Sequence, residues 1–206
     1  MKSILCLIAL AVPSFGAISF SLPGASESAS WTLTSAVHPG FNTFMTAANS
    51  WASAVAPDAG TASAVLNKTG GSGYIGGSFL YTASVVGSFS ISGTSSIGSL
   101  ETIVFQGKIS DLLDSVVLNY NGGSQALPAS FSAVFPGSGY PDRVWQWDLS
   151  AVPEITSYEI LYSGHHAANS LSVTTGDTYL EVIPEPSTGL LGMAALGLTL
   201  IRRRRA

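Results

Sequence analysis

Two tryptophans at alternate positions are the residues of this chain best spaced to bind a ligand. Trp145 and Trp147 flank Gln146 and are followed by Asp148. Alternate residues of a strand point to the same side, so two exposed indoles would form a platform on which sugar rings stack. On an inner face the pair would belong to the core, which is the commoner use of aromatic side chains. The same two alternatives hold for a second aromatic set: Phe41, Phe44 and Trp51.

Adjacent histidines raise the question of a metal site. His165 and His166 follow Ser163-Gly164. Neighbouring residues of a strand point to opposite faces, so in regular β structure the two imidazoles cannot hold one ion unless His38 joins one of them. The preceding Ser-Gly favours a loop, and we expect an exposed polar turn and no metal site.

The acidic residues could serve calcium binding or glycoside hydrolysis. Asp111 and Asp114 flank Leu112-Leu113, but one pair is far short of the roughly six to eight oxygens that calcium takes, so turn and cap roles are expected. Four further acids could supply the carboxylate pair of a glycosidase, and their spacing favours no particular pair: Asp142, Asp148, Glu154 and Glu159. Because nucleophile-elbow, P-loop and zinc-protease motifs are also missing from the sequence, we expect no catalytic residue, no cofactor and no enzymatic activity.

The N-terminus has the three regions of a secretory signal peptide. Lys2 supplies the positive charge, ILCLIALAV the apolar run and the residues from Pro13 to Ala17 the region of small residues. We expect a signal peptide over 1–16 with cleavage after Gly16. The alternatives are a cut after Ala17, a membrane anchor and a buried strand. Cys6, the single cysteine, lies inside this segment, so the mature chain would have no disulfide and no thiolate metal site.

The C-terminus has three parts in a fixed order. The triplet Pro184-Glu185-Pro186 is followed by an uncharged run, Gly189–Ile201, and then by the four arginines Arg202 to Arg205. A helix over about thirteen residues spans about 20 Å, which is short of the roughly 30 Å hydrocarbon core. The arginine side chains can extend their apolar stems along the membrane to reach the headgroups, which makes up part of this missing length. The arginines should stay on the cytoplasmic side of the membrane, and the body of the chain should lie on the opposite, exported side.

This order of triplet, short span and basic block resembles the PEP-CTERM sorting signal, which occurs on exported proteins of Gram-negative, exopolysaccharide-producing bacteria. The resemblance covers residues 182–205 only. It implies that Pro184, Glu185 and Pro186 are recognised by an exosortase, a membrane-embedded cysteine protease, and that the arginines retain the chain in the membrane until processing. These retention residues are Arg202, Arg203, Arg204 and Arg205. An ordinary tail anchor that is never cut is the alternative.

The exported part, 17–183, is acidic. It contains three basic and eleven acidic residues, which gives a net charge of −8, whereas the whole chain has −4 because most basic residues lie in the targeting segments. Phosphate recognition needs lysine and arginine, so nucleic acid is excluded as a partner.

Short alternating segments separated by Gly, Pro, Asn and Asp predict an all-β domain over 17–183, a single antiparallel sandwich or jelly roll. In the first part of the domain we expect two strands around a Pro-Gly turn in 19–33, and then neighbouring strands over Glu101–Ile109 and 115–120. Further along we expect a strand pair around the turn at 136–143 and a strand over 157–164. The domain should end in a hairpin around Thr175-Gly176-Asp177. Aromatic spacing of three and four predicts a short helix over Thr43–Val55, with an irregular loop as the alternative. Together the patterns predict an exported, non-catalytic protein of the cell surface or exopolysaccharide matrix. A carbohydrate-binding module is the alternative, and a glycan-acting enzyme is the weakest of the three.

Overall fold

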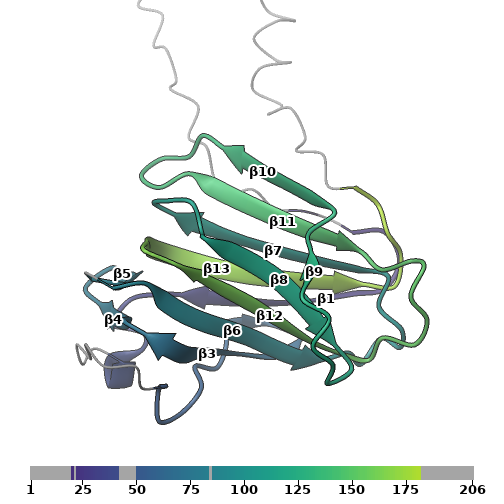
Figure 1. Cartoon of the computed structure of the whole chain (residues 1–206), viewed down its shortest axis with the longest axis horizontal. Helices are drawn as coiled ribbons and strands as arrows, with labels where there is room; N and C mark the ends of the chain where they lie inside the picture. Colours follow the sequence, from purple (N-terminus) through teal and green to yellow (C-terminus); the bar gives the residue numbers. More distant parts are fainter. Residues whose placement is uncertain (1–19, 21, 42–49, 84, 182–206) are drawn as a thin grey trace, which may run out of the picture. The chain divides into compact units, whose positions relative to one another are not determined.

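A computed structural model describes residues 20, 22–41, 50–83 and 85–181 of the chain (Figure 1). These residues belong to one compact unit, Ser19–Val182. The expected signal peptide over 1–16 and the expected sorting segment over 184–206 lie outside the described residues.

The strands form two antiparallel sheets (Figure 1). The eight-stranded sheet, called sheet A, has the order β10-β11-β7-β13-β1-β2, and β5 joins β13 and carries β4. Its strands are β1 (Ser26–Thr32), β2 (Ala59–Gly60), β4 (Tyr74–Gly76), β5 (Phe79–Tyr81), β7 (Thr102–Ile109), β10 (Phe131–Phe135), β11 (Asp142–Asp148) and β13 (Ala167–Gly176). The five-stranded sheet, sheet B, has the order β3-β6-β12-β8-β9. Its strands are β3 (Ser63–Gly71), β6 (Gly87–Thr94), β8 (Ser115–Tyr120), β9 (Leu127–Pro128) and β12 (Ser157–Gly164), and a 3-10 turn, η1 (Pro39–Phe41), precedes β2.

The inner faces of the two sheets enclose one core, as in a β-sandwich. Phe105 of sheet A lies 5.3 Å, between ring centroids, from Tyr162 of sheet B, and Tyr162 in turn stacks on Phe89 at 5.2 Å. Trp31 and Trp147 are among the largest side chains that this core buries completely. The expected all-β fold is therefore confirmed at the level of two packed antiparallel sheets.

Period-two alternation located several strands correctly. On β12 the side chains of Tyr158, Ile160 and Tyr162 are buried and their neighbours are half-exposed, because one face of the strand packs on the core and the other meets solvent. β8 likewise turns Leu118 inward, and the expected hairpin of β10 and β11 forms with a continuous register. The turn after β8 places Asn121 and Gly122 at positive φ, a conformation that Asn and Gly adopt more readily than other residues.

Three expectations about strand pairing are wrong. β7 and β8 are consecutive but belong to different sheets, so the partly exposed link between them passes from sheet A to sheet B. The terminal hairpin around Gly176 does not form; β13 is one ten-residue strand that ends there, between β7 and β1. The described part of 19–33 contains one strand, β1, instead of two. Alternation assigns faces to a strand, but it does not identify the partner strand.

The predicted helix over 43–55 is wrong where the structure describes it. Residues 43–49 lie outside the described part, and Trp51 to Val55 form an irregular segment with a bend at Ala52 and Ser53 along the edge of β3, in agreement with the alternative of an irregular loop. The Trp51 amide donates to the Lys68 carbonyl, and Val55 exchanges both backbone bonds with Leu66. These bonds and the burial of Trp51 and Val55 outweigh the weak helical preference of the spacing.

A second, small apolar cluster lies on the outer face of sheet A. Val104 of β7 and Val144 of β11 are covered there by Leu22, which precedes β1, and Phe131 and Phe135 of β10 pack beside them. The Asp177 amide donates to the Ala25 carbonyl and the Ala25 amide donates to the Asp177 carboxylate, which joins the entry of the domain to its exit. Both ends of the domain are thus fastened to sheet A.

Candidate binding surfaces

One groove of about 440 Å³ lies on the outer face of sheet B. The sheet register aligns Val65, Ser92, Glu159 and Asn119 in a row across β3, β6, β12 and β8. The remaining lining comes from small and hydroxyl residues: Ser63, Gly93, Thr94, Gly122, Gly123, Ser157 and Tyr158. The side chains offer hydroxyl and amide groups with one carboxylate and no cation, which suits a neutral polar ligand better than an anion.

A buried phenol lies in the wall of this groove. The Tyr158 hydroxyl lies close under Gly93, where a Cβ would sit 2.8 Å from the oxygen, and it has no hydrogen-bond partner among the described residues. Burial, and then the negative charge of Glu27, raise the pKa of Tyr158 above its ordinary value. The phenol therefore stays protonated at neutral pH and is no candidate base.

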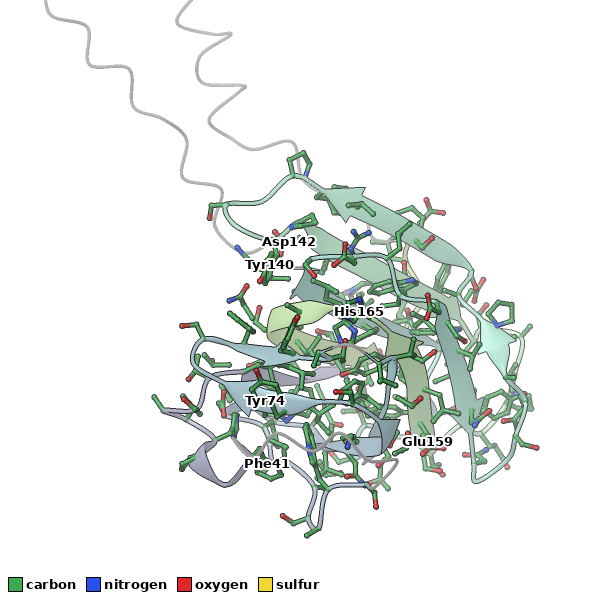
Figure 2. All side chains as sticks on the ribbon, turned by 60° about the vertical axis from the view of Figure 1, so that its left-hand side comes forward. Phe41, Tyr74, Tyr140, Asp142, Glu159 and His165 are labelled. Carbon is green, nitrogen blue, oxygen red and sulfur yellow. The ribbon has the colours of Figure 1, made fainter. Side chains whose placement is uncertain are left out.

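The four acids weighed for glycoside hydrolysis are not brought together in the groove. Only Glu159 lines it; Asp142 and Asp148 are at opposite ends of β11 in the other sheet, and Glu154 is in the loop before β12. Figure 2 shows Asp142 and Glu159 well apart. Two-carboxylate hydrolysis needs acids roughly 5 to 10 Å apart across one cleft, and the groove supplies one.

Trp145 and Trp147 do not form an exposed platform. Trp147 is fully buried and donates its indole N–H to the Leu127 carbonyl at 3.0 Å. Trp145 is half-buried and stacks on Phe105 at 5.3 Å. The pair faces inward on β11, so of the two alternatives for these residues the structure supports the core role.

The second aromatic set does not form an open face either. Trp51 is buried between Phe41, at 5.0 Å, and Phe89, at 5.9 Å. Phe44 lies outside the described residues. Phe41 is half-buried against the same core, so these aromatic residues close the end of the sandwich.

The sequence did not single out a third aromatic cluster, which lies on the β4–β5 hairpin. Tyr74 and Tyr81 are cross-strand partners 6.0 Å apart, and Phe79 lies 6.0 Å from Tyr81. All three are half-buried, while their neighbours Ile75 and Leu80 are fully buried in the core. The three rings therefore lie on the outward face of the hairpin. Period-two alternation over 74–81 was the available signal, but Gly76 at the end of β4 and Gly77 in the turn obscured it.

The adjacent histidines lie in the link between β12 and β13, as expected, but only one is exposed. His165 is at the surface and contacts the Ala83 carbonyl. His166 is buried against the rings of Phe89, at 5.7 Å, and Tyr162, at 6.0 Å. Burial lowers the pKa of His166 to about 4. Within the described ranges no group of three or more His, Cys, Asp or Glu side chains is arranged to hold a metal ion.

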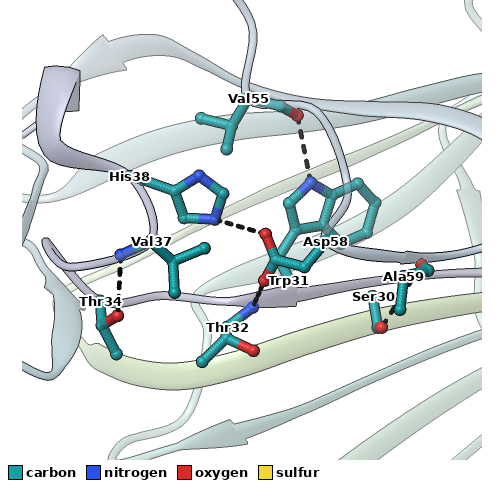
Figure 3. Close-up of polar contacts among 9 residues, drawn as sticks. All are labelled: Ser30, Trp31, Thr32, Thr34, Val37, His38, Val55, Asp58 and Ala59. Carbon is teal, nitrogen blue, oxygen red and sulfur yellow. Dashed lines mark hydrogen bonds and ion pairs between the residues drawn. The ribbon is translucent and has the colours of Figure 1, made fainter.

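His38 was the third histidine considered for a metal site with His165 or His166. It pairs with Asp58 (Figure 3). Its Nε2 lies 3.0 Å from Asp58 Oδ1, a distance typical of an ion pair, without the alignment of a hydrogen bond. The other carboxylate oxygen accepts the Thr32 amide, and the Trp31 indole donates to the Val55 carbonyl at 3.1 Å. Asp58 therefore ties η1 and β2 to the end of β1.

The expected sorting residues lie outside the described residues: Pro184, Glu185, Pro186, Arg202, Arg203, Arg204 and Arg205. Within the part of the chain that the structure describes, no helix has the length and apolar character needed to cross a membrane. Comparison of the chain with protein-family models, with curated proteins and with solved structures finds no match.

Proposed function

We propose that this chain is an exported, non-catalytic protein of the bacterial cell surface or exopolysaccharide matrix, held in the membrane by its C-terminus until an exosortase-like protease processes it. The observation that carries the proposal is the ordered C-terminal pattern of Pro184-Glu185-Pro186, a short apolar run and four arginines. An N-terminal signal peptide over 1–16 agrees with the same topology.

Two features of the described domain support a structural role: an uncharged face lined by hydroxyl groups and a tightly packed aromatic core. Outward positions of β1 and β13 are hydroxyls aligned in cross-strand pairs, such as Ser28 with Thr174 and Ser30 with Ser172. Such a face can hydrogen-bond to water or to neutral polysaccharide without carrying charge. The interior is filled by interlocking aromatic rings, which gives stability without disulfides.

The test compares the protein from hosts with and without an exosortase. We expect the intact mass to fall by the mass of a C-terminal fragment beginning near Pro184 only when the exosortase is present. Replacing the triplet, Pro184→Ala with Pro186→Ala, should leave the tail attached in both hosts. Identical masses of the unaltered chain in the two hosts would show that the tail is a permanent anchor.

The second candidate function is carbohydrate binding, and the outward cluster of Tyr74, Phe79 and Tyr81 favours it. Half-exposed rings on a rigid hairpin can stack on sugar faces. A glycan array with the processed protein should show binding that Tyr81→Ala reduces at least tenfold, whereas Tyr120→Ala, on β8 of the other sheet, should leave it unchanged. Absence of binding by the unaltered protein would favour a purely structural role.

A further inference from the structure

The edges of the two sheets differ in how they are protected against pairing with another chain. β2 and β9 have two residues each, and β9 contains Pro128. β3 has an irregular register between Lys68 and Gly70, and Val55 bridges its edge at Leu66. Short strands, proline, bulges and covering segments are the devices that keep sheet edges from pairing.

β10 is the edge strand of sheet A at the end opposite β2, and it has none of these protective features. Phe131–Phe135 reads FSAVF, with no charge, proline or glycine, and its register with β11 has no bulge. Among the described residues β11 is its only hydrogen-bonded neighbour. Phe131 and Phe135 pack on the cluster of Leu22, Val104 and Val144, which holds the strand in place, and Val134 is 53% exposed. An exposed, uncharged edge of this kind is a template for strand addition.

The charge distribution identifies what this edge accepts. The 27 residues 115–141, which include β10, contain no charged side chain, although the exported body has a net charge of −8. Two copies that approach through most other faces repel each other. Two copies that meet through β10 bring uncharged surfaces together. An antiparallel strand edge is also complementary to itself under a twofold rotation.

We propose that β10 pairs antiparallel with β10 of a second copy, so that sheet A continues across a twofold-symmetric dimer. Backbone hydrogen bonds of Phe131–Phe135 supply the contact, and Val134 packs against the partner copy. This inference goes beyond export and sorting, since a surface protein needs no self-association to be sorted.

The test uses the full chain with Cys6→Ser, exported and processed in its host, so that one introduced cysteine is the only thiol. Val134→Cys treated with a short bis-maleimide should give a crosslinked dimer several-fold more abundant than Val65→Cys. Val65 is the matched control because it is 37% exposed and lies on β3 of the other sheet. Equal crosslinking at the two positions would overturn the proposal. It would mean that the copies associate through another part of the chain, such as a retained C-terminal tail, and not through β10.

A second variant tests the same contact by disruption. Val134→Lys places a charge on the edge, and two such charges would meet in the dimer. Sedimentation should show the unaltered processed protein as a dimer and Val134→Lys as a monomer with unchanged circular dichroism. A persisting dimer would overturn the proposal, and if the lysine variant does not fold, the crosslinking comparison decides alone.

Discussion

His166 shows at the level of one residue how burial sets chemistry. Its imidazole packs on Phe89 and Tyr162, Nδ1 contacts the Gly164 carbonyl at 3.2 Å, and Nε2 has no partner among the described residues. Burial is the main cause of its lowered pKa; the Gly164 bond and the more distant Asp111 and Asp114 raise it in part. The residue is a neutral part of the core.

This burial predicts a pH-dependent stability. The folded state has a pKa of about 4 at His166 against an ordinary 6.5, so the unfolded chain binds more protons between these values. The free energy of unfolding should therefore fall as pH drops from 6.5 to 4, by on the order of 3 kcal/mol. Urea titrations across this range should show a flatter profile for His166→Phe. His165→Phe, the exposed neighbour, should keep the slope, and equal slopes for both variants and the parent would contradict the assignment.

At the scale of elements, close backbone approach fixes how β2 attaches to β1. Gly60 has a φ of +115°, and a Cβ there would lie 1.9 Å from the Ser28 carbonyl oxygen. A side chain cannot enter without separating the two strands. Because β2 follows Asp58, the same attachment holds the His38–Asp58 pair over the end of β1.

Gly60→Ala should therefore destabilise the protein by roughly 1–3 kcal/mol, measured by urea denaturation. Gly40, in η1, has no atom within 4 Å of a built Cβ, so Gly40→Ala should change the free energy of unfolding by no more than about 0.5 kcal/mol. A neutral Gly60→Ala would mean that β2 moves freely away from β1.

At the scale of the whole molecule, the stability of the described domain rests on packing. The single cysteine, Cys6, lies in the expected signal peptide. Continuous burial from Trp31 through Phe105 and Tyr162 to Phe89 links the two sheets. A domain of this size can bury enough apolar surface to fold without crosslinks.

The proposed cleavage after Gly16 predicts that the mature protein contains no thiol. After denaturation it should react with zero equivalents of a thiol reagent, and its thermal midpoint should be unchanged by reductant. A protein that keeps its first sixteen residues would show one equivalent. The Cys6→Ser chain serves as the zero-thiol reference for the assay.

Sequence alone was sufficient for features that depend on local order. Alternation on β12 follows from that strand having one core face, and the Asn121-Gly122 turn follows from the φ preference of its residues. The C-terminal pattern likewise needs no fold to be read, and the sorting role drawn from it stays a proposal. For Trp145 and Trp147, sequence left the choice between core and surface open.

Tertiary structure decided every feature that depends on which strands and side chains a residue packs against. Trp147 is buried because β11 turns that face toward sheet B, which its own sequence does not specify. The segment from Trp51 to Val55 is irregular and not helical because the β3 edge offered backbone bonds to Trp51 and Val55. The exposed edge of β10 and the outward orientation of Tyr74, Phe79 and Tyr81 depend on where sheet A places their hairpins, because β11 pairs with β7 and β5 pairs with β13. The physical reason is that a side chain's pattern fixes its face of a strand, while long-range packing fixes what that face meets.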